Sequence, residues 1–153
     1  MKTTDFLMPI KGTLLSIEQV PDEIFSERVM GDGFAIDMSG NEVISPVNGT
    51  VDSVFPGGHA VCIRGDCGAD FMIHVGLETY KLEGVNKPKV KAGQRVRQGD
   101  LLIKTNARRI RKATSSSITP VVFLHGETVN LLKENQLLDA GAANIISISK
   151  EDS

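Results

Sequence analysis

The chain has 153 residues, with 17 lysines and arginines against 19 aspartates and glutamates, a formal net charge of −2 at pH 7. This length is typical of one domain, so we expect residues 1–153 to form a single domain. The near-neutral charge disfavours nucleic acid as a partner, and no apolar run approaches the roughly 18 residues that a membrane-spanning helix needs.

Short runs rich in Val, Ile, Thr and Phe alternate with turns that contain many of the 15 glycines and 6 prolines. This pattern is typical of short strands joined by tight turns. It predicts strands over 13–17, 33–38, 42–45, 50–55, 60–64, 70–75, 94–96, 101–105, 119–123 and 145–149. Short helices are predicted only over 107–113 and, from a weak amphipathic spacing, over 129–138. The expected fold is all-β and mainly antiparallel, a compact barrel or sandwich.

The first predicted strand and the turn before it are repeated later in the chain. Segment 9–17 aligns with segment 46–54, and seven of the nine aligned positions are identical or exchange one aliphatic residue for another. We interpret the repeat as a turn built by Pro and Gly, followed by a strand with one buried face, used twice in the same fold.

A β-hairpin is predicted from strands 60–64 and 70–75 and the intervening turn 65–68. If the turn is centred between its second and third residues, His59 stands opposite His74. Directly paired residues have Cβ atoms about 4.5 to 5.5 Å apart and side chains on the same face of the sheet. A slip of one residue would separate the two imidazoles, so this juxtaposition depends on the register.

Two chemistries suit a pair of facing imidazoles. The first is zinc binding, but in this register Cys62 lies on the face opposite His59, and Cys67 lies in the turn. We therefore expect no bound metal, and two free thiols in a reducing compartment. The second is nucleophilic attack by one neutral ring nitrogen on a phosphoryl group, while the other imidazole donates a hydrogen bond to the phosphoryl oxygens. The remaining histidine, His125, is expected at the surface.

No Gly-rich motif for ATP or a dinucleotide is present, so no cofactor is expected. The N-terminus lacks the apolar stretch of a secretion signal, which predicts a cytoplasmic protein.

From residue 9 to about residue 122 the sequence resembles the glucose-type enzyme IIA (EIIA) of the bacterial phosphoenolpyruvate-dependent sugar phosphotransferase system. The segments that carry the resemblance are 9–12 (PIKG), 20–36 (VPDEIFSERVMGDGFAI), 45–51 (SPVNGTV), 59–60 (HA) and 72–77 (MIHVGL).

The resemblance implies a phosphoryl carrier that accepts phosphate from phospho-HPr and hands it to a cysteine of an enzyme IIB (EIIB) domain of a sugar permease. It implies that His74 is phosphorylated on its tele nitrogen, Nε2, that the Gly76 carbonyl orients the other ring nitrogen, and that His59 assists. The carrier would meet the membrane only through the permease. With a partner, the two histidines could also act as weak zinc ligands.

The resemblance also implies a docking face around the histidines. Its acidic rim would be Asp22 and Glu78, and its apolar contacts Ile24, Phe25, Met30, Phe55 and Met72, with Val61 flanking the pair.

Some positions depart from the family pattern. Glu78 stands where Asp is usual, Gly57 stands where Thr is common, and segment 85–88 is a shorter turn. Segment 108–112 is basic, which favours a solvated helix face over a partner-binding patch.

Other functions on a similar barrel remain open. A lipoyl or biotinyl carrier would need a modifiable lysine on an exposed hairpin, usually after Met, and the one Met-Lys pair is at the N-terminus. A LytM-type zinc endopeptidase would need an H-x-H pair, which the sequence lacks. A regulatory binding protein is the third alternative.

Overall fold

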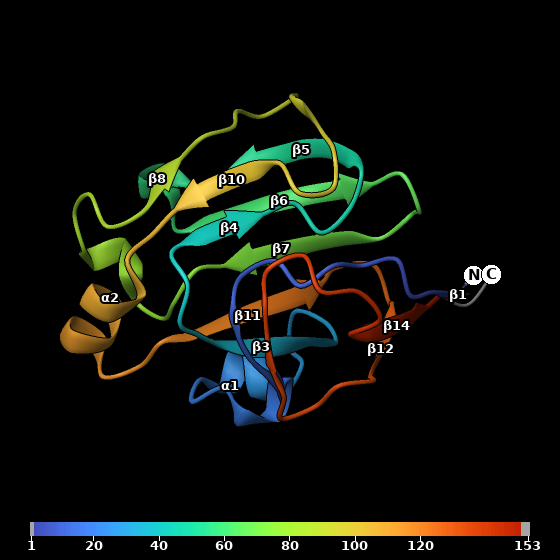
Figure 1. The fold of residues 1–153 in the computed structure, drawn as a ribbon, viewed down its shortest axis with the longest axis horizontal. Coiled ribbons are helices and arrows are strands. Elements are labelled where there is room, and N and C mark those ends of the chain that lie inside the picture. Colours follow the sequence, from blue (N-terminus) through green and yellow to red (C-terminus); the bar gives the residue numbers. More distant parts are fainter. Residues whose placement is uncertain (1, 151–153) are drawn as a thin grey trace.

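Antiparallel strands are the main regular elements of the computed structural model, which describes residues 2–150 (Figure 1). The strands are β1 (Lys2–Thr3), β2 (Gly12–Ser16), β3 (Gly33–Met38), β4 (Glu42–Ile44), β5 (Gly49–Val54), β6 (Ala60–Gly65), β7 (Asp70–His74), β8 (Lys87–Pro88), β9 (Arg95–Val96), β10 (Leu101–Lys104), β11 (Ile118–Phe123), β12 (Thr128–Leu131), β13 (Leu137–Leu138) and β14 (Ile146–Ser149). The helices are α1 (Glu23–Ser26) and α2 (Ala107–Thr114), with single 3-10 turns η1 (Ile17–Gln19), η2 (Pro56–Gly58) and η3 (Thr79–Lys81).

The strands form one large and two small sheets. The large sheet has the order β13-β2-β3-β11-β7-β6-β5-β9, and the small sheets have the orders β1-β14-β12 and β4-β10-β8. Apolar side chains from all three sheets meet in one main core, which gives a sandwich-like arrangement. A cluster of phenylalanine rings in edge and tilted contacts lies in this core, formed by Phe6, Phe34, Phe71 and Phe123.

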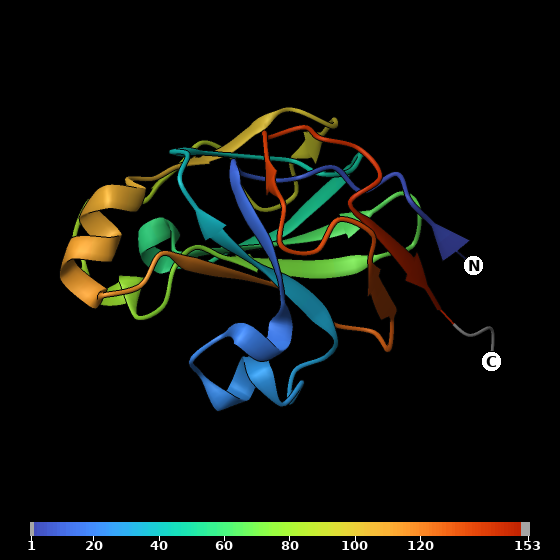
Figure 2. The same cartoon turned by 60° about the horizontal axis from the view of Figure 1, so that its bottom comes forward.

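A second, smaller apolar cluster lies on the other face of the large sheet. Ile17, Val20 and Phe25, from the segment of η1 and α1, pack on Met72 and Val122. Figure 2 brings this segment forward, beneath β3. A short helical segment thus covers part of this face of the large sheet, near the C-terminal end of β7.

The all-β antiparallel prediction is confirmed, and each predicted strand overlaps one in the structure. The predicted helix over 107–113 is α2. The predicted helix over 129–138 is wrong, because its two ends form β12 and β13. Val129 and Leu131 both pack against the core, and their spacing of two residues is that of a strand. Asn135 has a positive φ, which would interrupt a helix.

The internal repeat corresponds to two equivalent strands, β2 and β5, each paired antiparallel with the strand that follows it. Both begin at a glycine. A Cβ atom added at Gly12 would lie 2.4 Å from the Asp37 carbonyl oxygen, and one added at Gly49 would lie 2.4 Å from that of Arg64. The repeated glycine is therefore required by close approach of the neighbouring backbone.

Replacing Gly49 with alanine should lower the free energy of unfolding by about 2 to 3 kcal/mol, because the methyl group forces β5 away from β6. Urea unfolding followed by circular dichroism measures the change. Asp52→Ala, at an exposed position of the same strand, is the control and should stay within about 0.5 kcal/mol of the parent. Equal stability of the two variants would contradict the steric argument.

Candidate functional site

The two histidines meet at one end of the β6–β7 hairpin. His74 is the last residue of β7, and His59 is the residue between η2 and β6. Their ring centroids lie 5.4 Å apart, with the planes at 68°. The predicted proximity of the two imidazoles is confirmed.

The register predicted for this hairpin is wrong by one residue. His74 pairs with Ala60, and the Gly65 N–H donates to the Ala69 carbonyl oxygen, so the loop has three residues and ends at Gly68 with φ of 97°. Three-residue loops of this kind place their last residue in the left-handed region. His59 nevertheless reaches His74, because its backbone is helical (φ −76°, ψ −15°) and the alternation of faces along a strand does not apply to it.

A backbone carbonyl two residues along the chain orients the imidazole of His74. Its Nδ1–H donates to the Gly76 carbonyl oxygen at 2.7 Å. A carbonyl only accepts, so the neutral ring carries its proton on Nδ1 and leaves the lone pair on Nε2.

Gly76 itself is held by groups that the sequence analysis did not identify. Its N–H donates to Thr119 Oγ1 at 3.1 Å, and its φ is 73°. A Cβ atom at this position would lie 2.6 Å from Thr79 and 3.1 Å from Ile110 of α2. No sequence signal marks the contacts with Thr119 and Ile110, because these residues lie far from Gly76 in the chain.

His59 is also anchored by a backbone carbonyl. Its Nδ1–H donates to the Pro56 carbonyl oxygen at 3.0 Å, across the η2 turn. The ring of Phe55 contacts it edge-on, with centroids 5.6 Å apart.

The protonation of His74 is set by its surroundings. Burial lowers its pKa, the hydrogen bond to Gly76 opposes this effect, and the nearby His59 lowers it further. The net direction is downward, so the ring is neutral, the form in which Nε2 is a nucleophile.

A shallow hollow of about 330 Å³ opens beside His74. It is lined by Asp22, Ile24, Phe25, Met30, Phe55, Met72, His74, Leu77 and Glu78. Ile24, Met30 and Phe55 are 51%, 40% and 38% exposed, whereas Phe25 and Met72 are buried beneath them. Most of the predicted docking face is therefore brought together here.

Val61 does not belong to this face. It is fully buried in the main core, because the register places it on the opposite side of β6 from the residues that face His74. The prediction that it flanks the histidine pair is wrong.

Two carboxylates lie at the edge of the hollow. Asp22 caps α1 by accepting the Ile24 N–H at 3.0 Å, and Glu78 has a left-handed backbone and an ion pair of 3.5 Å with Lys81. Both side chains also line an adjoining hollow next to the end of α2. The apolar face thus has an acidic rim, as predicted.

The corrected register changes the position of one cysteine. Cys62 pairs with Met72 and packs against the smaller apolar cluster, on the same face as His74, so the argument from opposite faces does not hold for it. Burial raises its thiol pKa. Within residues 2–150, no group of three or more His, Cys, Asp or Glu side chains is arranged to hold a metal ion.

His125 lies at the surface, with Nε2 at 3.2 Å from Asp70.

Comparison with known proteins identifies the family to which the chain belongs. The family model described as "phosphoenolpyruvate-dependent sugar phosphotransferase system, EIIA 1" matches residues 4–129. The chain belongs to this family. It is an EIIA phosphoryl carrier of the glucose-type phosphotransferase system, a phosphotransferase component that works through a phosphohistidine.

The solved structure of glucose permease IIA from Mycoplasma capricolum is similar to this EIIA over nearly its whole length. The TM-score is 0.85 at 31% sequence identity, covering 95% of this chain and 96% of that chain. None of the helices within residues 2–150 is long and apolar enough to cross a membrane.

We expect His74 of this EIIA to titrate below the ordinary histidine value of about 6.5, because burial disfavours the imidazolium. Its contribution to the free energy of unfolding is complete above that ordinary value and falls as the pH drops toward the lowered pKa. Titration of the imidazole C–H resonances by NMR measures the value, with His74→Gln assigning the signal. A pKa at or above 6.5 would contradict the proposed effect of burial.

Proposed function

We propose that His74 is the phosphoryl acceptor of this EIIA and that the phosphoryl group is carried on Nε2. The observation that carries the proposal is the 2.7 Å hydrogen bond from Nδ1 to the Gly76 carbonyl. It fixes the tautomer and leaves the lone pair on Nε2, while the lowered pKa keeps the ring neutral.

Each transfer exchanges one bond to phosphorus for another. As His74 Nε2 bonds to phosphorus, the P–N bond to the histidine of phospho-HPr breaks and that imidazole leaves with the electron pair. In the second transfer a cysteine thiolate of an EIIB domain attacks the same phosphorus, and His74 departs. Such reactions depend mainly on positioning and on stabilising the charge of the phosphoryl oxygens.

We assign that stabilisation to His59. Because its Nδ1–H is already engaged by the Pro56 carbonyl, it can donate from Nε2 to a phosphoryl oxygen only as an imidazolium. A phosphoryl group on His74 places negative charge beside it and favours that form. His59 is then a hydrogen-bond donor when the phosphoryl group is present.

The apolar face around the histidines would dock both partners, since HPr and EIIB must each reach the same nitrogen. Ile24, Met30 and Phe55 supply exposed apolar contacts, and the carboxylates of Asp22 and Glu78 would attract a basic rim on the partner. Large exposed apolar side chains gathered beside a reactive group are typical of an interaction site.

We place the protein in the cytoplasm, where HPr and the EIIB domain of a sugar permease would meet it. It would contact the membrane only through the permease. On this chain the proposed chemistry uses the imidazoles of His74 and His59, and we propose no cofactor, metal or nucleic acid for it.

Replacing either histidine with glutamine should separate their roles. His74→Gln should abolish phosphorylation, because an amide cannot form the phosphohistidine bond. His59→Gln keeps a donor amide, so the protein should still accept phosphate but pass it on slowly. Intact mass after incubation with phosphoenolpyruvate, enzyme I and HPr, each omitted in turn, measures acceptance. A fully phosphorylated His74→Gln protein, or phosphate mapped to His59, would reverse the assignment.

Charge introduced on the docking face should slow transfer without unfolding the protein. Ile24→Asp and Phe55→Asp are suited to this test, whereas Phe25 is too buried to accept a charge. We expect the rate from phospho-HPr to fall by at least about tenfold. Leu137→Asp, an exposed apolar position on β13, is the matched control and should transfer at the parent rate. Unchanged transfer in both test variants would contradict the placement of the docking face around His74.

A further inference from the structure

A separate hollow of about 290 Å³ lies between the segment that leads into β8, the end of β10 and the start of α2. These three elements lie at the same end of the molecule in Figure 1. The hollow is lined by Gly84, Val85, Lys87, Lys104, Thr105, Asn106 and Arg109. Its charged residues are all cationic.

Two of these cations are forced together by the sheet. Lys87 and Lys104 are directly opposite each other in the β8–β10 ladder, so their side chains leave the same face. Like charges at such positions destabilise a sheet. No ion pair in the described part of the chain involves either lysine.

The third cation is held in place by α2. Arg109 lies in the first turn of the helix, and its Nη2 donates to the Glu83 carbonyl at 3.0 Å. The helix N-terminus adds partial positive charge on this side. Arg111, by contrast, turns to Ser117 and Met38, so the basic segment is not simply a solvated face.

One carboxylate lies on the same face of the small sheet as the two lysines, and a second lies next to the lining segment. Glu42 is opposite Lys104 on the other neighbouring strand, β4, and Glu83 precedes the lining segment. Neither residue lines the hollow, and neither forms an ion pair with its cations.

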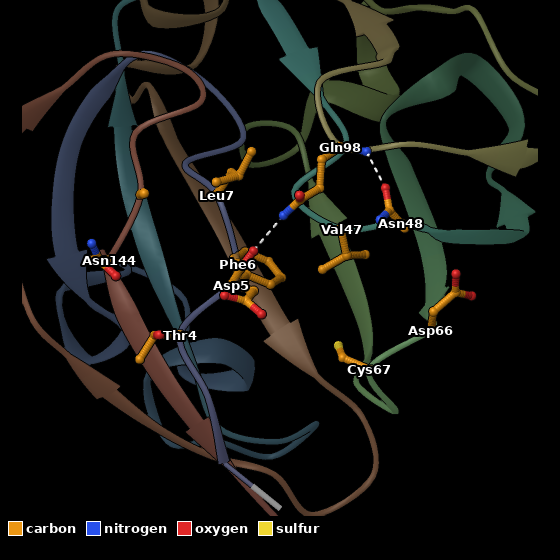
Figure 3. Close-up of a pocket in the computed structure, with 11 residues that line it drawn as sticks. Thr4, Asp5, Phe6, Leu7, Val47, Asn48, Asp66, Cys67, Gln98 and Asn144 are labelled. Atoms are coloured by element: carbon orange, nitrogen blue, oxygen red, sulfur yellow. Dashed lines mark hydrogen bonds between the residues drawn. The ribbon is translucent and has the colours of Figure 1, made fainter.

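A hollow of about 280 Å³ at the turn between β6 and β7 shows the difference (Figure 3). There Asp66 is paired with Arg95 at 2.8 Å, and Gln98 donates to the Asp5 carbonyl and to Asn48. The Asp66 carboxylate is thus paired with a cation of the protein itself. Lys87 and Lys104 form no ion pair in the described residues, and an external anion could contact both.

We propose that the hollow between β8, β10 and α2 binds a small phosphate-bearing anion. Lys87, Lys104 and Arg109 would contact its oxygens, and binding would relieve the repulsion between the two lysines. The volume is at the lower end of ligand sites, which fits one or two phosphate groups rather than a large molecule. The site is distinct from the His74 face, because the two hollows share no lining residue.

Binding of inorganic pyrophosphate, measured by calorimetry and by NMR shifts at constant ionic strength, tests the proposal. Lys87→Gln, Lys104→Gln and Arg109→Gln should each weaken binding by about tenfold, the usual size of a lost charged hydrogen bond. Lys112→Gln, which removes one exposed positive charge from α2 outside the hollow, is the control and should bind like the parent.

Lys87→Gln gives a second readout, because Lys87 faces only Lys104, whereas Lys104 also faces Glu42. Without an anion, this variant should be at least as stable as the parent, because one of two facing positive charges is gone. With pyrophosphate, the parent should gain more in unfolding temperature than the variant.

Three results would overturn the proposal. They are the absence of pyrophosphate binding, equal binding by all variants, and shifts that map to His74 instead. A further experiment mixes the protein with vesicles that contain or lack an anionic phospholipid and measures how much protein they capture. If anionic vesicles capture the parent but not the lysine variants, and pyrophosphate does not bind in solution, the proposal of a soluble ligand is rejected.

Discussion

The hydrogen bond from His74 Nδ1 to the Gly76 carbonyl is the constraint on which the site depends. It requires the chain to reverse within two residues of the strand end, which a glycine with positive φ permits. It also requires that carbonyl to stay in place, and the Thr119 hydroxyl and the packing of α2 on Gly76 provide this. The contacts around the end of β7 therefore fix the position of the Gly76 carbonyl oxygen.

The face around this bond combines two properties that usually conflict. A neutral nucleophile needs partial burial, and a carrier must be accessible to two proteins in turn. The structure meets both needs by placing His74 at the end of a strand, above buried Phe25 and Met72 and beside exposed Ile24, Met30 and Phe55. The reactive nitrogen is desolvated enough to stay neutral, yet the hollow is open.

Much of this arrangement was predictable from the sequence. Strand positions followed from short β-branched runs between glycines, the repeat identified β2 and β5, and the predicted hairpin brought His59 and His74 together. The hairpin register was not predictable, because the choice between a two-residue and a three-residue loop depends on Gly68 taking a left-handed backbone. The assignment of Val61 failed for the same reason. The helix predicted over 129–138 failed because pairing of β12 with β14 and of β13 with β2 outweighed a weak local pattern.

Both histidines are anchored by carbonyls only two and three residues away along the chain. The orientation of each ring is therefore a local property of its own turn and does not wait for a partner. A carrier built in this way has little reorganisation left to do when a proposed partner, HPr or EIIB, arrives. The rates of its two proposed transfers would then depend on the encounter with each partner rather than on rotation of the rings.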